Sequence, residues 1–462
     1  MRQTRRDFLV AAGMCASAIG AGGCLHFPRL REVRRKSAGE RLNIGAIGVG
    51  GCGQANWSAA YEAGENIAAM CDVDETALLT GREKVATACP GVRLYKDFRV
   101  LFDAEKNLDA VFISTPDHGH GLQAAWALGH GCHVYVETPL ARTLREVRFL
   151  KEKARACGAV TQLGDQGSAA PELRRAVELL ATGLIGKVSE VHVWTGRPIW
   201  PQGVQRPEGS DPAPATLDWD LWLGGAPVRP YKSKVYHRFN WRGWHEFGTG
   251  ALGDVGCHLM NLPFRALGLG GPASVEAVDS TERFSETYPK ASKVRFEFAA
   301  RGKLRPPVTL WWYDGNWKPA PELMPQVMAA HRQVPDAGCL MVGERGVWLV
   351  SDDLGTRHSL ALRGEERVID FEKHEACLAV PATAPRVQGQ QREFLDSVRS
   401  GKAPSSSMEH AAPLSESVLA GCVAQRVRGK LEWNSRTCRF SKSDEANRWV
   451  APEFREGWDF MK

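Results

Sequence analysis

The sequence predicts an α/β protein in which an N-terminal doubly wound parallel sheet is followed by a C-terminal α+β domain with an open, mainly antiparallel sheet. Its 462 residues exceed the size at which one hydrophobic core keeps growing, which indicates two domains. Strand-like and helix-like segments alternate over residues 42–160, as expected for a parallel sheet. Over residues 161–462, several segments alternate polar and apolar residues instead, which is typical of an antiparallel sheet with one covered face.

Residues 1–41 have the pattern of a targeting segment and are set apart from the fold. Two adjacent arginines, Arg5 and Arg6, precede an apolar stretch from Phe8 to Gly23, which is typical of a twin-arginine (Tat) leader. That stretch is shorter than the roughly 20 apolar residues of a spanning helix. We expect an exported, periplasmic protein. The sequence AGGC at residues 21–24 leaves open either a lipid anchor on Cys24 or cleavage by a signal peptidase.

The charge distribution supports this division and excludes one class of partner. Residues 1–41 contain nine Lys and Arg against three acidic residues, which accounts for the whole net charge of +6. The neutral remainder argues against a nucleic-acid partner, whose phosphates require a basic surface. We expect residues 29–41 to form a solvated tether, with contact to anionic lipid as an alternative. The ten cysteines after Cys24 show no paired spacing and predict mostly buried thiols, with one or two disulfides left open.

The expected elements of the first domain are the strands 42–47, 67–71, 110–114 and 133–136 and the helix 122–128. In the second domain we expect strands at 188–194, 274–278, 293–298 and 308–313, and helices at 390–399 and 414–427 that pack back on the first domain. Residues 198–231 form a long loop rich in Pro, Gly and Trp, and such loops are usually functional.

A dinucleotide site is predicted directly after the first strand. Residues 48–53 (GVGGCG) follow that strand and open a helix, and Asp72 ends the next strand 24 residues beyond Gly48. Gly48 permits a tight turn, Gly50 lets the backbone approach a pyrophosphate, and Gly53 allows close packing of helix and strand, with Gly51 between them. The amides at the helix N-terminus would then face the phosphates. Because the Asp72 carboxylate would bind ribose hydroxyls and repel a 2′-phosphate, NAD is favoured over NADP, with a turn carboxylate as the alternative.

Three further motifs, at residues 115–118 (TPDH), 137–139 (ETP) and 248–258 (GTGALGDVGCH), resemble those of the Gfo/Idh/MocA oxidoreductase family. The resemblance covers nearly all of residues 42–460 and is nearest to exported members with twin-arginine leaders. It implies a Rossmann domain, then an α/β domain whose open sheet covers the nicotinamide and mediates homo-oligomerisation. It also implies a carbohydrate or polyol substrate, and cofactor contacts from Thr115, Pro116 and Glu137.

The resemblance has one departure that affects the chemistry. The family has E-K-P where this chain has Glu137, Thr138 and Pro139, and the family's Lys assists proton transfer at the substrate hydroxyl. A threonine hydroxyl cannot supply the charge of an ammonium group. The departure therefore argues against ordinary dehydrogenase chemistry, while cofactor binding is unaffected. Some members without the Lys are similar to redox-assisted glycosidases, in which NAD oxidises the sugar transiently so that the leaving group can be eliminated.

Asp254 and His258 are the remaining catalytic candidates. Their i, i+4 spacing places both on one face of a helix, and a neutral His beside a carboxylate is suited to accept a proton from a sugar hydroxyl. The family motif has both residues in that role, and a satisfied core pair is the alternative. Asn261 stands where the family often has Asp.

His118 and His120 follow a strand end, where open α/β sheets bind ligands. We expect His118 to contact nicotinamide or substrate and His120 to cap the following helix. A metal site of Asp117, His118 and His120 is disfavoured because nothing supplies a second shell, and no metal is expected.

The expected substrate contacts lie between residues 192 and 244, where aromatic and basic side chains cluster. Indole faces stack on sugar rings, and Arg and His bind hydroxyls. We expect about two of the six tryptophans to line the site; the preferred contacts are His192, Arg197, Trp241 and Arg242.

Export also constrains the mechanism. Outside the cytoplasm no NAD pool regenerates a loose cofactor, so we expect the dinucleotide to be tightly held. An oxidoreductase acting on a sugar or polyol is the leading interpretation. A redox-neutral glycosidase or lyase and a non-catalytic, cofactor-stabilised binding protein are the alternatives.

Overall fold

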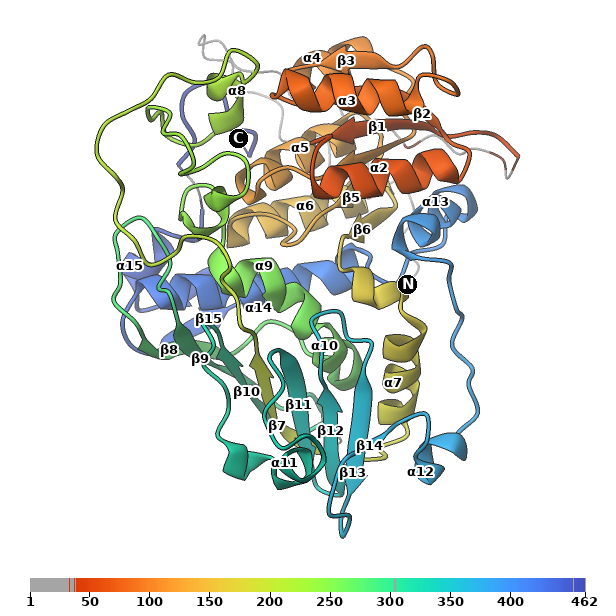
Figure 1. The fold of residues 1–462 in the computed structure, drawn as a ribbon, viewed down its shortest axis with the longest axis vertical. Coiled ribbons are helices and arrows are strands. Elements are labelled where there is room, and N and C mark those ends of the chain that lie inside the picture. The colour runs from red at the N-terminus through yellow and green to blue at the C-terminus, as the bar shows by residue number, and fades with distance from the viewer. Residues whose placement is uncertain (1–32, 34–36, 38, 303–304, 452, 462) are drawn as a thin grey trace, which may run out of the picture.

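The computed structural model describes residues 33, 37, 39–302, 305–451 and 453–461, and the leader with Arg5, Arg6 and Cys24 lies outside these residues. A parallel sheet occupies one end of the molecule and a larger sheet the other, with the helices α9 and α14 between them (Figure 1). None of the helices in the described part of the chain combines the length and apolar character needed to cross a membrane. The cysteines from Cys52 onward are all unpaired; nine are buried and Cys52 is exposed.

The first sheet has six strands in the order β3-β2-β1-β4-β5-β6, and every neighbouring pair is parallel. The strands are β1 Asn43–Ile47, β2 Asn66–Cys71, β3 Arg93–Tyr95, β4 Ala110–Ile113, β5 His133–Val136 and β6 Thr161–Leu163. This confirms the predicted doubly wound sheet. Its sixth strand lies just past the boundary expected at residue 160. The strand order reverses between β1 and β4, where open α/β sheets bind their ligands.

Helices cover both faces of this sheet. They are α2 Cys52–Glu62, α3 Glu75–Val85, α4 Phe98–Ala104, α5 Asp117–Gly129 and α6 Leu144–Cys157. Apolar side chains of α2, α3 and the late helix α13 (Gln390–Ser400) form one core layer, while those of α4, α5 and α6 belong to the other. The helix expected at 122–128 begins five residues earlier, so residues 117–120 form its first turn rather than a loop.

The second sheet has ten strands in the order β14-β13-β12-β11-β7-β10-β9-β8-β15-β16. Only β7 and β10 pair in parallel, so the sheet is mixed and mostly antiparallel, as predicted. The strands are β7 Val188–Trp194, β8 Ser274–Ser280, β9 Ser292–Phe298, β10 Val308–Tyr313, β11 Gly338–Gly343, β12 Gly346–Val350, β13 His358–Leu362, β14 Ile369–Asp370, β15 Leu431–Asn434 and β16 Arg439–Ser441. Along β9, buried and half-buried residues alternate strictly, which gives the sheet one fully covered face.

The remaining helices of this half are α7 Pro171–Ala181, α8 Trp219–Leu223, α9 Gly250–Leu259, α10 Asn261–Leu267, α11 Pro325–His331, α12 Glu375–Leu378, α14 Met408–Arg426 and α15 Asp444–Asn447. Short 3₁₀ turns occur at η1 Gln166–Ala169, η2 Asn240–Gly243 and η3 Pro321–Leu323.

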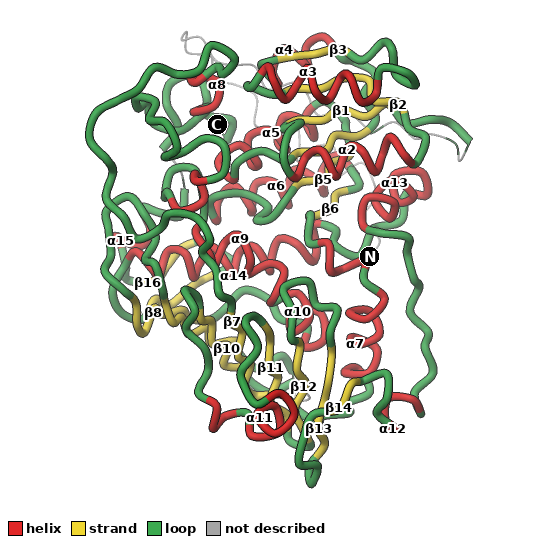
Figure 2. Tube along the Cα trace, viewed as in Figure 1, coloured by secondary structure: helices red, strands yellow, loops and turns green. Residues whose placement is uncertain are grey.

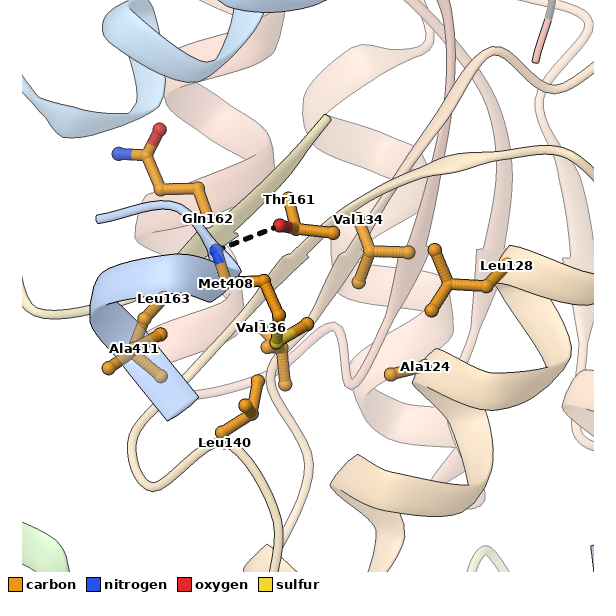
Figure 3. Close-up of a pocket in the computed structure, with 10 residues that line it drawn as sticks. All are labelled: Ala124, Leu128, Val134, Val136, Leu140, Thr161, Gln162, Leu163, Met408 and Ala411. Atoms are coloured by element: carbon orange, nitrogen blue, oxygen red, sulfur yellow. Dashed lines mark hydrogen bonds between the residues drawn. The ribbon is translucent and has the colours of Figure 1, made fainter. Parts of the chain in front are cut away.

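Helix α14 joins the two halves. It contacts α6 and β6 on one side and α9, β8 and β9 on the other, and it begins at Met408 rather than at the expected residue 414. Figure 3 shows its first turn against the edge of the parallel sheet, where the Met408 amide donates to Thr161 Oγ1 at 3.1 Å. The side chains around this contact are almost all aliphatic and closely packed, so this seam fixes the two halves together and is no binding site.

The predicted long loop runs from β7 along one side of the molecule to the parallel sheet, largely without regular structure (Figure 2). It extends past the expected end at residue 231 to the start of α9 at Gly250. It has an apolar core of its own, formed by Leu217, Trp222, Leu223, Ala226, Tyr231, Tyr236, Trp241, Trp244 and Phe247. Asp74, which caps the N-terminus of α3, forms a bridge to Leu217 and an ion pair with Arg238 at 2.9 Å. The loop therefore covers the carboxyl ends of the parallel strands.

Candidate active site at the domain junction

The turn between β1 and α2 requires glycine at two positions. Gly48 has φ +80°, and a Cβ there would lie 2.5 Å from the Ser114 carbonyl oxygen. A Cβ on Gly53 would lie 1.9 Å from the Gly48 carbonyl oxygen, so the helix can approach the strand only without a side chain. Gly51, which precedes α2 with φ +55°, has open space beside it, and a Cβ on Gly50 would make only an ordinary contact with Ala77 at 3.5 Å. The turn thus leaves a free surface in front of the amides at the start of α2.

Asp72 is fixed against this turn. Its Oδ2 accepts hydrogen bonds from the amides of Val49 at 2.8 Å and Gly50 at 3.4 Å, and its Oδ1 accepts one from Asp74 at 3.0 Å. Burial raises the pKa of this carboxyl, and the three amide donors lower it. The side chain is only partly buried, and its remaining lone pairs suit hydroxyl donors. The glycine turn and Asp72 therefore fit the pyrophosphate and ribose of a dinucleotide.

Two other expected cofactor residues lie at the next strand end. Thr115 and Pro116 follow β4 and are partly exposed, with the Thr115 hydroxyl donating to Gln123 Oε1 at 2.7 Å. Both lie at the reversal of the strand order, next to the glycine turn.

Glu137 follows β5 and is held by two amide side chains that the sequence analysis missed. Its Oε1 accepts hydrogen bonds from Asn56 Nδ2 at 2.6 Å and from Gln166 Nε2 at 3.3 Å. Burial raises the pKa of the Glu137 carboxyl to about 7. No local motif marks Asn56, inside α2, or Gln166, after β6, because they meet Glu137 only through the fold.

The structure brings the three predicted catalytic residues together. Asp254 and His258 lie one turn apart on α9, and Thr138 Oγ1 lies 3.2 Å from His258 Nε2 and 3.5 Å from the Asp254 carbonyl oxygen. His258 Nδ1 is buried and has no hydrogen-bond partner among the described residues. Burial lowers the pKa of His258, and the negative charge of Asp254 opposes this. The ring is therefore neutral at neutral pH, with one nitrogen available to a ligand.

Arg242 provides the cation of this group. Its Nε donates to Asp254 Oδ1 at 2.8 Å, and its guanidinium carbon lies 4.4 Å from the ring centroids of both Phe239 and Trp241. Burial raises the pKa of Cys52, the first residue of α2, and the positive charge of Arg242 opposes this shift, so Arg242 lies within electrostatic range of the cofactor turn. Trp241 itself is buried, and its indole nitrogen donates to the Arg238 carbonyl at 3.0 Å, so it forms a wall behind Arg242.

Arg197 lies within electrostatic range of His258, together with an acidic residue that the sequence analysis missed. Arg197 Nη2 is 3.9 Å from Asp353 Oδ2, and Arg197 lowers the pKa of His258 while Asp353 raises it. Asp353 belongs to the turn between β12 and β13, about 95 residues after His258, and no motif identifies it.

His192 lies away from this junction, contrary to the prediction that it contacts substrate. It is buried within β7, with Nδ1 3.2 Å from Tyr313 Oη and Nε2 3.3 Å from Glu190 Oε1. Its strand neighbours Val191 and Val193 pack in the core shared with α9. Because side chains alternate along a strand, His192 faces the opposite side of the sheet.

The two histidines of α5 also differ from expectation. His118 has Nε2 2.9 Å from the Trp222 carbonyl and Nδ1 3.3 Å from the Phe247 carbonyl, and burial lowers its pKa to about 4. Both nitrogens thus fix α5 to the long loop, which leaves neither for nicotinamide or substrate. His120 lies in the first turn of α5 and bonds the carbonyls of Thr115 and Pro139, each at 2.8 Å, instead of capping the helix.

The aromatic side chains are more deeply buried than the sugar-site prediction supposes. Five of the six tryptophans between residues 192 and 244 are buried, namely Trp194, Trp200, Trp222, Trp241 and Trp244. The sixth, Trp219, stacks on Trp222 at 4.7 Å between ring centroids. The exposed aromatic group beside Arg242 is Phe239, which the sequence analysis missed and which is 43% exposed. In the described part of the chain, no cluster of three or more His, Cys, Asp or Glu residues is arranged to hold a metal ion.

Comparisons with known proteins agree with this architecture. Residues 42–165 match the family profile described as an oxidoreductase family with an NAD-binding Rossmann fold, and residues 171–302 match its C-terminal alpha/beta domain. The WlbA dehydrogenase of Chromobacterium violaceum, solved with NADH and UDP-GlcNAcA, superposes with a TM-score of 0.60 at 15% identity, covering 87% of this chain and 99% of its own. The aldose-aldose oxidoreductase of Caulobacter crescentus gives 0.59 at 16% identity, covering 85% and 100%. At such identities these likenesses show the fold alone.

Two curated relatives are similar over shorter stretches. Glycosyl hydrolase family 109 protein 2 of Shewanella sp. (strain ANA-3) is 31% identical over 171 residues, or 32% of this chain and 36% of the relative. The scyllo-inositol 2-dehydrogenase (NAD(+)) of Bacillus subtilis is 30% identical over 137 residues, or 29% and 36%. The chain thus matches about a third of the length of each relative.

Proposed function

Because this chain belongs to the Gfo/Idh/MocA oxidoreductase family, a family of NAD-dependent enzymes, we propose that it is an NAD-dependent oxidoreductase that acts on a sugar or polyol and holds its cofactor tightly. The observation that carries this proposal is the convergence of Thr138, Asp254 and His258 beside the N-terminus of α2. Convergent polar groups at the reversal of the strand order are the expected position of an active site.

The chain's own residues fit the cofactor. The amides at the start of α2 would hold the pyrophosphate, Asp72 the adenosine ribose, and Glu137 with Thr115 and Pro116 the nicotinamide side. Bound there, the nicotinamide would accept a hydride from substrate carbon or return one. NAD is favoured over NADP because the Asp72 carboxylate would repel a 2′-phosphate.

His258 is the proposed general base. Its neutral ring has a free Nδ1, and Asp254 lies one turn earlier on α9, where its charge stabilises the imidazolium that forms when the ring takes a proton. Thr138 contacts the other nitrogen and so orients the ring. In place of the family's Lys, we infer that Arg242 supplies the positive charge near the reacting hydroxyl, since it is bound to Asp254 on the side of the cofactor turn.

One observation favours a second candidate function, a redox-neutral glycosidase or lyase. Thr138 replaces the cation that the family uses, and Arg242 is already paired with Asp254, so the site carries less free positive charge than an ordinary family dehydrogenase. The similarity to glycosyl hydrolase family 109 proteins supports the same alternative. A cofactor-stabilised binding protein without catalysis is the third.

A single series of measurements separates the three. Mass spectrometry of the purified protein should find retained dinucleotide, and incubation with a panel of sugars deuterated on carbon should place deuterium on that retained dinucleotide. Net NADH absorbance indicates oxidoreduction, whereas release of an aglycone without net NADH selects the glycosidase. Retained dinucleotide with no deuterium transfer across the panel would favour the binding protein. A protein that binds no dinucleotide at all contradicts the proposal.

We also propose that the protein is exported by the twin-arginine route to the periplasm, tethered through its N-terminal segment, and that it forms a homo-oligomer. The outer face of the second sheet supports the oligomer, since the half-buried Trp311 lies there with Lys293 4.7 Å from its ring centroid. Light scattering of the purified protein tests this assembly.

A further inference from the structure

The turn between β12 and β13 is braced so that it reaches the junction. Asp352 accepts hydrogen bonds from the amides of Thr356 at 2.9 Å and Arg357 at 3.0 Å, and His358 Nε2 lies 2.7 Å from the Gly355 carbonyl. The Leu354 carbonyl packs so closely on η1 that a Cβ at Gly167 would lie 2.2 Å from it. A loop of the outer sheet is thereby fixed next to Gln166, which binds Glu137.

Asp353 has one oxygen that nothing in the chain satisfies. Its side chain is 39% exposed, but Oδ1 is buried and has no hydrogen-bond partner among the described residues. Its other oxygen is 3.9 Å from Arg197 Nη2, which is too long for a hydrogen bond. A buried carboxylate oxygen is costly without a donor, so the position calls for a donor that comes from a ligand.

The charges around His258 indicate which kind of ligand. Asp353 and Arg197 both act on the pKa of His258, so they lie within electrostatic range of the proposed base, and Asp254 with Arg242 forms a second pair of opposite charges near it. Two carboxylates against two guanidinium groups leave no excess cation for an anionic substrate. A hydroxyl group, in contrast, is a donor without charge.

We propose that Asp353 is a specificity-determining residue that accepts a hydrogen bond from a hydroxyl group of a neutral sugar and disfavours the corresponding uronate. Arg197 orients the Asp353 carboxylate without occupying Oδ1. This inference rests on the proposed function, because it assumes that a sugar binds beside His258.

Calorimetric titration of the NAD-loaded protein tests the inference without relying on turnover. The probes are glucose, galactose and mannose, each compared with its matched uronate. Wild type should bind at least one neutral sugar more tightly than its uronate. Asp353→Asn, which keeps the shape and removes the charge, should lose about tenfold to a hundredfold in affinity for that sugar and much of the discrimination against the uronate.

Two controls separate a direct contact from a folding defect. Asp103→Asn alters an exposed carboxylate on α4, 79% exposed, and should leave every affinity unchanged. Retained dinucleotide and an unchanged melting temperature in Asp353→Asn show that the loop and the cofactor site persist. The inference is wrong, while the proposed function stands, if wild type binds a neutral sugar and Asp353→Asn has the same affinities as wild type for that sugar and for its uronate. The same holds if wild type binds the uronate more tightly than the neutral sugar. If wild type binds neither sugars nor uronates, the proposed function itself fails, and the inference with it.

Discussion

At the scale of single residues, His258 has the contacts that a base requires and few that a core residue would have. Thr138 holds Nε2, and Nδ1 is left without a partner in the described structure. We predict that His258→Gln lowers kcat/KM by about 10² to 10⁴, the usual contribution of a general base, while the retained dinucleotide is unchanged. Because burial lowers the pKa of His258, the rate should stay constant down to the ordinary histidine range and fall only at lower pH. If His258→Gln retains full activity on a sugar that the wild-type enzyme converts, the His258 ring has a structural role instead.

Asp117 gives a separate prediction about pH and stability. It is buried, accepts a hydrogen bond from Thr249 Oγ1 at 2.5 Å, and has a pKa that burial raises to about 8. The folded state therefore holds a proton that the unfolded state loses near pH 4, so stability falls as pH rises from about 4 to about 8. Each pKa unit corresponds to about 1.4 kcal/mol, so the Asp117 contribution is several kcal/mol.

The substitution Asp117→Asn should remove this contribution, since the amide stays neutral and its oxygen still accepts the Thr249 hydrogen bond. Urea unfolding at pH 5 and pH 8 should show a smaller loss of stability in the variant than in wild type. Other buried carboxylates also have raised pKa values, among them Asp314 and Asp165. The free energy of unfolding should therefore still fall somewhat with rising pH in both proteins. Equal slopes in wild type and Asp117→Asn would show that Asp117 is ionised in the folded protein.

At the scale of elements, the turn from β1 to α2 allows the fold and cofactor roles of its glycines to be separated. A Cβ at Gly53 would overlap the Gly48 carbonyl at 1.9 Å, whereas one at Gly50 would meet only Ala77 at an ordinary 3.5 Å. We predict that Gly53→Ala destabilises the protein by about 2 kcal/mol or more, since the helix must shift. Gly50→Ala should keep the melting temperature but lose at least tenfold in NAD affinity, because its methyl group projects where the pyrophosphate would lie. Gly91→Ala, in an exposed turn with open space, is the control, and unchanged NAD affinity in Gly50→Ala would place the cofactor elsewhere.

The elements that could be predicted from the sequence are those whose cause is local. β5, β7 and β10 begin and end where their apolar and alternating patterns do, and the glycine turn with Asp72 follows from a motif of fixed spacing. Asp254, His258 and Thr138 were found through a family resemblance, and the structure brings them within contact. Asp353 and Gln166 could not be found, because only the packing of distant loops brings them to the junction. His192 was misplaced for a simpler reason, since residue type indicated a site while strand alternation turned its side chain away.

At the scale of the whole molecule, the candidate site exists only when both halves are folded together. The glycine turn, Asp72 and Thr138 belong to the parallel sheet, whereas α9, Arg242 and Asp353 belong to the second half, and α14 holds the two together. A dinucleotide held at this junction would also be enclosed on one side by the long loop, which Asp74 binds through Arg238. We therefore propose that the cofactor is inserted where NAD is present, before or during folding.

This requirement leads to the prediction about export. A twin-arginine leader carries folded proteins, so under the proposed export route the chain would cross the membrane with its dinucleotide already bound, whereas a route for unfolded chains would leave the junction without a source of NAD. We predict that replacing both Arg5 and Arg6 by Lys keeps the protein in the cytoplasm with its dinucleotide, and that the wild-type protein recovered from the periplasm contains about one dinucleotide per chain. Cell fractionation followed by mass spectrometry measures both quantities. Substituting Arg34 and Arg35 by Lys, in the same basic segment but after the apolar stretch, is the matched control and should not affect export. Export of the Arg5→Lys, Arg6→Lys variant at the wild-type level, or wild-type periplasmic protein without dinucleotide, would show that the cofactor and the leader are not linked in this way.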